Sequence, residues 1–329
     1  MSHHPNSVKP AAPASRRVLV LAGPTASGKT SVSLMIAPRL KAEILSADSR
    51  QIYRFMEIGT ARPTDADMKS VRHYFVDELS PDQDFNAGNF GKAGRTIIDG
   101  LFRRGKTPLI VGGSGLYIRA LVDGFFEGPS ADPELRKRLY RRITLPGGPE
   151  VLLKELRAVD PESASRMLPS NTRRIVRALE VYELTGVPIS ALQKEKIETG
   201  FSPVFVGLMW DRAQLYRRID DRVDSMIHRG LIGEVRALRR MGYGASLNSL
   251  QTTGYQETFQ YLDGVISRER MIELIKRNTR RYAKRQLTWF RQDSRIRWFP
   301  VGDEGQFPEL AQRIVGHFLA GEDRSSRSS

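Results

Sequence analysis

A glycine-rich turn directly after an apolar run is the feature that most constrains how this chain folds. The octapeptide Gly23-Pro24-Thr25-Ala26-Ser27-Gly28-Lys29-Thr30 has the spacing G-x-x-x-x-G-K-[ST] and follows the apolar residues 18–22. A strand, such a turn and a helix together form a phosphate cradle, because the glycines let the backbone wrap an anion and the helix start adds its positive end. Lys29 then supplies a mobile cation, and the Thr30 hydroxyl is a ligand for Mg²⁺. The alternative is a glycine turn that happens to contain Lys-Thr. The flanking strand and helix favour a site for a di- or triphosphate.

Strand-like and helix-like segments alternate over the first third of the chain. We expect strands at 17–22, 43–46, 74–76 and 108–111, and helices at 28–40 and 86–104. This alternation predicts an α/β fold with a mostly parallel sheet, in which ligands gather at the carboxyl ends of the strands. The phosphate cradle, Asp48 and the glycine-rich residues 112–115 each follow a predicted strand, so we expect them to converge in space.

The middle of the chain changes character. From Asp132 to about Lys196 the pattern is helical and charged, and a β-like run returns at 203–208. We therefore expect a P-loop NTPase-like parallel sheet core formed by residues 16–128 and 203–320, with an inserted helical domain at 129–202. The part after 208 is expected to be helical and basic, and to close with a short edge strand at 296–299. Residues 1–15 and 321–329 have the composition of disordered tails.

Composition excludes several classes of site. The chain has no cysteine, which excludes disulfides, thiolate metal sites and a cysteine nucleophile. No apolar run approaches the ~18 residues of a membrane span. The first residues lack the apolar segment of a secretory signal, and the five histidines show no metal-ligand spacing. We expect a cytoplasmic protein with no membrane partner.

The net charge of +15 is a second constraint, because the positive charge is clustered. Nine residues between 276 and 297 are Lys or Arg, and the single acid among them is Asp293. Two further basic clusters lie at 136–142 and 173–177. Such clusters favour a nucleic-acid partner, although a solvated surface of a basic protein would have the same composition.

Asp48 is the main acid near the predicted phosphate cradle. The strand at 108–111 runs into glycines where a nucleotide hydrolase would carry an acid. Asp48 is placed either to hold Mg²⁺ through water, to act as a general base, or only to close a turn with Ser49. Arg218 and Arg222 lie four residues apart on a predicted helix, where they either clamp phosphate oxygens or pair with neighbouring aspartates.

The basic segment near the C-terminus has the period of a helix. Met271, Ile275, Tyr282 and Trp289 fall on one stripe, which we interpret as a core face rather than a base-stacking platform. Two rows of cations cover the other side and are suited to tracking a phosphate backbone. These rows are Lys276, Arg280, Lys284 and Arg277, Arg281, Arg285.

Six segments in order resemble the tRNA dimethylallyltransferase family. They are residues 23–30, 48–54 with 58–63, 112–117, 130–136, 171–180 and 283–291, and they span roughly residues 17–299. The resemblance implies transfer of a dimethylallyl group from dimethylallyl diphosphate to N6 of adenine 37, next to the tRNA anticodon, with Mg²⁺ as the metal. It also implies that a diphosphate leaving group occupies the cradle, which accounts for the missing hydrolase acid.

The same resemblance implies roles for individual residues. Asp48 is the general base at adenine N6, Arg222 contacts the diphosphate, and Ser114 lies near the reacting amine, where many members of the family carry Thr. Gly23, Pro24, Thr25, Ala26, Ser27, Gly28, Lys29 and Thr30 bind the diphosphate or nucleotide, with Thr30 as the metal ligand. The implied tRNA contacts are Asp48, Ser49, Arg50, Gln51, Ser114, Arg136, Arg173, Arg174, Arg177, Lys284, Arg285, Gln286 and Arg291, together with residues 251–256. We expect a monomer that grips the anticodon stem-loop from two sides and takes adenine 37 out of the stack.

Three other functions stay open on the sequence. They are a P-loop small-molecule kinase or ATPase, prenyl transfer to free AMP or ADP, and RNA binding without catalysis. The basic segment 276–297 argues against a mononucleotide acceptor, which needs no such surface. Asp48 and Lys29 argue against a protein without catalytic activity.

Overall fold

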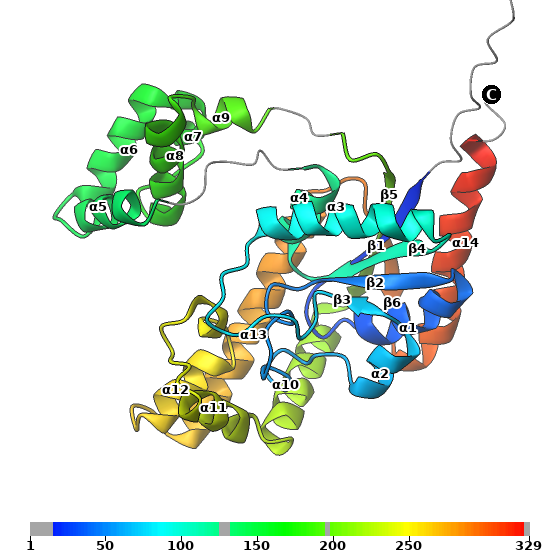
Figure 1. The fold of residues 1–329 in the computed structure, drawn as a ribbon. Coiled ribbons are helices and arrows are strands. Elements are labelled where there is room, and N and C mark those ends of the chain that lie inside the picture. Colours follow the sequence, from blue (N-terminus) through cyan, green and yellow to red (C-terminus); the bar gives the residue numbers. More distant parts are fainter. Residues whose placement is uncertain (1–15, 125–131, 195–197, 326–329) are drawn as a thin grey trace, which may run out of the picture. The chain divides into compact units, whose positions relative to one another are not determined.

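The computed structural model describes residues 16–124, 132–194 and 198–325 of the chain. The chain divides into two compact units, Met1–Val122 with Gly200–Ser329 and Asp123–Thr199 (Figure 1). The predicted N-terminal tail, residues 1–15, and the first predicted domain boundary, at 128–129, lie outside the described residues.

The first unit is built on a six-stranded sheet in which all neighbouring strands are parallel. The strand order is β3-β2-β4-β1-β5-β6. The strands are β1 (Arg17–Ala22), β2 (Ala42–Ala47), β3 (His73–Tyr74), β4 (Thr107–Gly112), β5 (Ser202–Trp210) and β6 (Arg297–Val301). The α/β fold with a parallel sheet that the sequence predicts is confirmed, and β6 forms the predicted edge strand.

Helices cover both faces of this sheet. Figure 1 shows α3 (Ala87–Arg103) and α4 (Gly115–Val122) over one face, with α1 (Lys29–Arg39) and α14 (Phe307–Ser325) packed together on the other. Leu19 and Leu109 pack with Ile36 and Ile314 of the second pair of helices. Successive side chains of a strand point to opposite faces, so Val20 is buried beneath the first pair. Burial on both faces explains why the central strands read as continuous apolar runs.

Helix α14 extends the fold beyond its predicted end. The composition of residues 321–329 indicates a tail, but the helix continues to Ser325. Phe307, Leu310, Ile314 and Phe318 form a buried stripe at helical spacing. Once this stripe has fixed the helix against the sheet, each further residue adds a backbone hydrogen bond at little cost, so the helix runs on into polar sequence.

The remaining helices of the first unit surround the carboxyl ends of the strands. They are α2 (Asp65–Ser70), α10 (Arg212–His228), α11 (Leu231–Arg240), α12 (Tyr255–Leu262) and α13 (Arg268–Arg291), with 3-10 turns at Asn248–Leu250 and Glu304–Gln306. Helix α13 packs against both α10 and α12, so the basic segment of the sequence is part of the body of this unit.

The second unit is helical and has a core of its own. It contains α5 (Pro133–Ile143), α6 (Gly148–Val159), α7 (Pro161–Ser165), α8 (Thr172–Thr185) and α9 (Ile189–Leu192). Leu139, Leu152, Leu156 and Ile175 are buried in its core. In neither unit does a described helix combine the length and the apolar character needed to cross a membrane.

Candidate active site

A cavity of about 580 Å³ opens at the carboxyl ends of β1, β2 and β4. Its lining joins the three segments that were expected to converge: the phosphate cradle through Lys29 and Thr30, the turn at Asp48, and the glycines Gly112 and Gly113. Helices α10, α12 and α13 and the loops at 59–63 and 251–254 supply further walls. The lining residues of these helices are Arg222, Val223, Met226, Gln256, Glu257, Ile275, Thr279, Tyr282, Arg285 and Gln286.

The phosphate cradle has the backbone that its glycines predict. Gly28 adopts a φ of 87°, in the left-handed region that favours glycine, and a Cβ there would overlap the ring of Phe307. Helix α1 begins without a side-chain cap, which leaves its first N–H groups for an anion. Ser27 Oγ is buried and lacks a hydrogen-bond partner within the described residues. An unmet polar group of this kind is one that a bound anion can satisfy.

Two buried cations meet in this cavity. Burial, together with the charge of Arg222, lowers the pKa of Lys29 to about 7, against the opposing charge of Asp48. Burial also lowers the pKa of Arg222, again against the pull of Asp48. Two desolvated cations with one carboxylate between them make a site that favours a multiply charged anion.

Arg218 and Arg222, the two arginines of α10 that the sequence singles out, have different surroundings. Arg222 faces the cavity, with Nη2 3.5 Å from the carbonyl oxygen of Thr60. Arg218 instead braces the cradle: its Nε donates to the carbonyl of Ala26 at 2.8 Å, and its guanidinium lies over the Trp210 ring. Two of the nearby acids of α10 are bound elsewhere, since Asp220 pairs with Arg280 and Asp224 with Lys276.

Asp48 closes a turn and lines the cavity at the same time. Its Oδ1 accepts hydrogen bonds from the backbone N–H of Arg50 at 2.8 Å and of Gln51 at 3.4 Å. Both bonds end on Oδ1, so Oδ2 is left for a ligand in the part of the chain that the structure describes. Ser114 adjoins this turn, because its Oγ accepts the N–H of Ser49 at 3.2 Å.

Gln286, one of the predicted tRNA contacts, is largely buried and lines the cavity. Its side chain is 7% exposed, and its amide joins two segments of the cavity. Oε1 accepts the N–H of Thr25 at 2.9 Å, while Nε2 donates to the carbonyl of Gly113 at 2.9 Å. Gln286 therefore joins the phosphate cradle to the glycines that follow β4.

The predicted core stripe of α13 is wrong in its C-terminal half. Met271 and Ile275 are buried, but Tyr282 and Trp289 are each 36% exposed. Residues 275, 282 and 289 are seven apart, and such a stripe drifts about 20° per heptad around a straight helix. Over the length of α13 the drift carries it off the core, and Ala283, Gln286 and Phe290 take the buried positions.

Tyr282 thereby becomes part of the cavity lining. Burial of its hydroxyl, together with the charge of Asp48, raises the pKa of Tyr282 to about 12, against the opposing effect of a hydrogen bond with Ser114. The guanidinium of Arg285 lies 5.7 Å from the centre of the ring. No sequence motif distinguishes this tyrosine from a core residue, because only the drift of the stripe exposes it.

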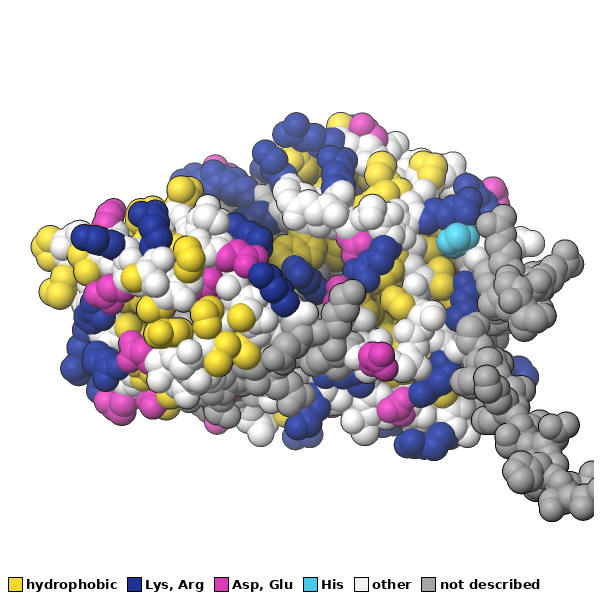
Figure 2. All heavy atoms as spheres, turned by 90° about the horizontal axis from the view of Figure 1, so that it is seen from above, with side chains coloured by type: hydrophobic (Ala, Val, Ile, Leu, Met, Phe, Trp, Pro, Cys, Tyr) yellow, Lys and Arg dark blue, Asp and Glu magenta, His cyan; other side chains and the backbone are white. Residues whose placement is uncertain are grey.

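The other predicted tRNA contacts divide into free and paired cations. Arg173 and Arg174 on α8 and Lys284, Arg285 and Arg291 on α13 are exposed. Arg136 and Arg177, in contrast, both bind the buried carboxylate of Glu180, at 2.7 Å in each case. Figure 2 shows Lys and Arg side chains distributed over the face in view, with acidic side chains between many of them. Arg50 and Gln51 line the cavity, as do Gln251 and Gln256.

The residues near Thr30 fit a magnesium ion only together with a phosphate ligand. Thr30 and Asp48 line one cavity, but the described residues contain no group of three or more His, Cys, Asp or Glu side chains that could hold a metal. Mg²⁺ takes six oxygen ligands and commonly binds through one or two protein groups, substrate phosphates and water. One hydroxyl and one carboxylate agree with that mode.

Comparison with known proteins gives a consistent result. Residues 51–293 match the family described as IPP transferase, a range that begins just after Asp48. The chain is 45% identical over 300 residues to the tRNA dimethylallyltransferase of Pelotomaculum thermopropionicum, covering 91% of this chain and 95% of that protein. It is 44% identical to tRNA dimethylallyltransferase 1 of Pelobacter propionicus, covering 94% and 98%.

Solved structures agree with these relatives. The tRNA isopentenylpyrophosphate transferase of Bacillus halodurans is 37% identical, with a TM-score of 0.69 and coverage of 95% of this chain and 99% of that one. A eukaryotic dimethylallyltransferase, described as acting on tRNA, is 25% identical with a TM-score of 0.79, covering 93% and 80%. Sequence and fold therefore agree along nearly the whole chain, and the chain belongs to the IPP transferase family, the tRNA dimethylallyltransferases.

Proposed function

We propose that this protein transfers the dimethylallyl group of dimethylallyl diphosphate to N6 of adenine 37 in the anticodon stem-loop of tRNA. The observation that carries the proposal is the shared cavity of Lys29, Arg222 and Asp48, which offers two cations to a diphosphate and a carboxylate to an amine. The names of the relatives, tRNA dimethylallyltransferase, agree with this substrate pair.

The reaction forms one bond and breaks another. The N6 nitrogen attacks C1 of the dimethylallyl group, the C1–O bond breaks, and the diphosphate leaves with the electron pair. Lys29, Arg222 and the first N–H groups of α1 stabilise the charge that grows on the departing oxygens. Because an exocyclic amine on adenine is a poor nucleophile, Asp48 aids the step by accepting the N6 proton on Oδ2.

The turn at Asp48 suits this role. The hydrogen bonds from Arg50 and Gln51 fix the carboxylate through Oδ1, so Oδ2 faces the substrate in one orientation. Ser114 and Tyr282 lie beside it and are placed to contact the amine or the adenine ring. Adenine 37 has to leave the anticodon stack to reach them.

Thr30 would hold Mg²⁺, with Asp48 close enough to act through a water. The bound ion would neutralise charge on the diphosphate oxygens. The rest of the proposed chemistry comes from the side chains and backbone of this chain.

The exposed cations favour tRNA over a free mononucleotide as the acceptor. Lys284, Arg285 and Arg291 follow Tyr282 along α13, outward from the cavity, and would contact phosphates of the stem-loop. Arg173 and Arg174 of the helical unit would supply further contacts. We propose that the protein acts as a monomer in the cytoplasm, and light scattering of the free protein would test the oligomeric state.

Mass spectrometry of tRNA nucleosides tests the function directly. Incubation with unmodified tRNA, dimethylallyl diphosphate and Mg²⁺ should give dimethylallyl-adenosine at position 37, and Asp48→Asn should abolish most of it. Product on free AMP at a comparable rate would favour the mononucleotide transferase. Turnover of ATP without tRNA, with no modified nucleoside, would favour the kinase.

A further inference from the structure

One wall of the cavity is formed by a loop that contains no helix or strand. Residues 57–63, the wall loop, follow the Asp48 turn in the sequence and supply Gly59, Thr60, Ala61 and Pro63 to the lining. Ala61 adopts a φ of 47°, in the left-handed region that non-glycine residues seldom occupy. Such a loop needs partners from outside to keep its shape.

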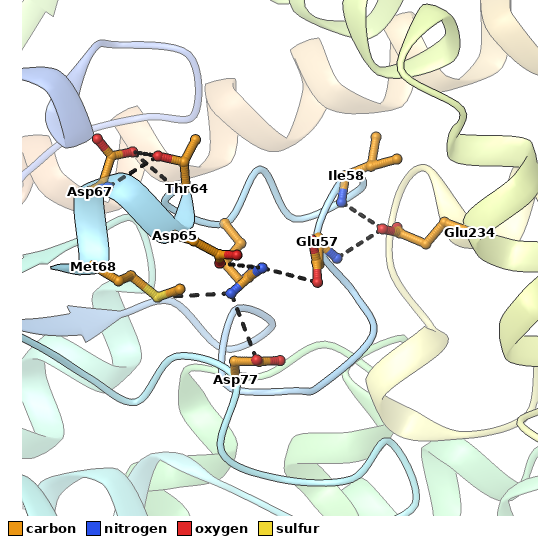
Figure 3. Close-up of polar contacts among 9 residues, drawn as sticks. Glu57, Ile58, Thr64, Asp65, Asp67, Met68, Asp77 and Glu234 are labelled. Atoms are coloured by element: carbon orange, nitrogen blue, oxygen red, sulfur yellow. Dashed lines mark hydrogen bonds and ion pairs between the residues drawn. The ribbon is translucent and has the colours of Figure 1, made fainter.

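Glu234 of α11 provides these partners at the start of the wall loop. Its Oε2 accepts the N–H groups of Glu57 at 2.9 Å and Ile58 at 2.7 Å, and its Oε1 accepts the N–H of Gly59 at 3.1 Å. Figure 3 shows the carboxylate directed at two of these amides across the gap between α11 and the loop. One carboxylate thus fixes three successive backbone donors, although 175 residues separate it from Gly59.

Tyr255 completes this arrangement from a third element. Its hydroxyl donates to Oε1 of Glu234 at 2.7 Å, and the tyrosine is fully buried at the start of α12. A Cβ at Gly59 would overlap the Tyr255 ring, so the loop backbone lies directly against that ring. Glu234 therefore fixes the wall loop by hydrogen bonds, and the Tyr255 ring limits how closely the loop can approach α12.

The wall loop in turn contacts the groups assigned to catalysis. The carbonyls of Thr60 and Ala61 accept hydrogen bonds from Gln51 Nε2, at 3.4 and 3.2 Å. The backbone N–H of Gln51 is one of the two donors to Asp48, and the Thr60 carbonyl also accepts a hydrogen bond from Arg222 at 3.5 Å. A displacement of the loop would thus reach both the base and the leaving-group cation.

Arg62 holds the far end of the wall loop. Its guanidinium pairs with Glu57 at 3.0 Å, Asp65 at 3.2 Å and Asp77 at 3.7 Å. These ion pairs involve no backbone N–H of the wall loop, whose first three amides bind Glu234.

We propose that Glu234, supported by Tyr255, is a positioning residue for the transfer reaction: it holds the wall loop so that Asp48 and Arg222 stand in their reactive places. This inference rests on the proposed function. Since Glu234 touches neither reacting group, its loss should lower the rate of the chemical step more than the binding of either substrate.

Two variants and a control test the proposal. Glu234→Gln keeps the size of the side chain but replaces one acceptor oxygen with an NH₂ group, so at least one of the three amides loses its carboxylate partner. Tyr255→Phe keeps the ring against Gly59 and removes only the hydroxyl. Glu273→Gln is the matched control, because Glu273 is an exposed acid on α13 that pairs only locally with Arg270.

The measurements are the single-turnover rate with both substrates saturating, the Kd values for pyrophosphate and tRNA, and the melting temperature. We expect Glu234→Gln to slow the chemical step by roughly 10- to 100-fold, because small misplacements of reacting groups have effects of that size. Tyr255→Phe should slow it by a smaller factor, roughly threefold to tenfold. Both Kd values should stay within about threefold of the wild type, and Glu273→Gln should change none of these quantities.

Other outcomes would overturn the inference. If the tRNA-binding fraction of Glu234→Gln reacts at the wild-type rate, the residue serves only folding stability. If Tyr255→Phe, which is the milder change, also leaves the rate unaltered, the network has no catalytic role. A wild-type protein that forms no modified nucleoside would instead refute the proposed function, so the two failures are distinguishable.

Discussion

The guanidinium of Arg222 lies close enough to the ammonium of Lys29 to lower its pKa, in addition to the effect of burial. With the pKa of Lys29 at about 7, the free protein loses one of its two cavity cations near neutral pH. The cavity therefore favours an anion, and Lys29 carries its full positive charge only when an anion is bound.

Binding of the diphosphate should depend on pH through Lys29. Above pH 7 the terminal phosphate of dimethylallyl diphosphate is almost fully ionised, since its last pKa is about 6. The free protein must then take up a proton on Lys29 to bind it, so the Kd should rise by up to about tenfold per pH unit above 7. Calorimetric titrations between pH 7 and 9 would measure this rise. A Kd that stays constant over this range would show that binding takes up no proton at Lys29.

The lowered pKa of Lys29 affects folding stability in the opposite direction: stability should increase with pH, whereas diphosphate binding should weaken. Because the folded-state pKa lies below the usual 10.5, the unfolded chain binds the Lys29 proton more tightly. The contribution of Lys29 to stability should therefore improve as pH rises from about 7 towards 10.5.

Replacement of Asp48 by Asn should separate its two roles. The asparagine Oδ1 still accepts from Arg50 and Gln51, so the turn is kept, while the base on Oδ2 is lost. We expect a fall in kcat of roughly 10²- to 10⁴-fold with tRNA affinity almost unchanged. Steady-state kinetics and a filter-binding assay would check both values. A variant with near-normal kcat would exclude Asp48 as the base.

The exposure of α13 leads to a comparison between neighbours. Phe290 is 3% exposed, and its replacement by Ala should lower the free energy of unfolding by about 3–5 kcal/mol. Trp289 is 36% exposed, so its replacement by Ala should lower the free energy of unfolding by only about 1–2 kcal/mol, which corresponds to the area it still buries. Urea denaturation of both variants tests this order. Equal losses would place Trp289 in the core after all.

Salt dependence should distinguish the free cations of α13 from the paired ones. If Lys284 and Arg285 contact tRNA phosphates, replacing both by Ala should reduce the slope of log K against log salt by roughly one to two units. The matched control replaces Lys276 and Arg280, which carry the same charge but pair with Asp224 and Asp220 of α10. That control should change the slope by less than about half a unit. The reverse order would move the tRNA interface to the N-terminal half of the helix.

The parts of the site that follow one another closely in the sequence could be predicted from it. Gly28, Lys29 and Asp48 are at the ends of strands, and parallel strands bring such ends together whatever the rest of the fold does. Local spacing also sufficed for the edge strand β6 and for the long basic helix.

The structural contacts that the sequence does not reveal join residues far apart in the chain. Gln286 is held by Thr25 and Gly113, and Glu234 by the amides at 57–59, so nothing near either residue in the sequence signals its role. The sequence pattern places Tyr282 in the core only if residues seven apart stay on one face along the whole of α13, and on a straight helix they do not. Packing against α10 and α12 decides which turns of the helix are buried, and that packing has no local signature.

The contact between Gly28 and Phe307 bears on the order in which the protein can be made. Gly28 is synthesised early, but the Phe307 ring that packs against it belongs to α14, almost three hundred residues later. Strand β5, which flanks β1 on one side, is also synthesised late, after the helical unit. A nascent chain therefore lacks the ring that packs against Gly28 until α14 has been synthesised. We expect chains that stop before α14 to bind a diphosphate more weakly than the folded protein.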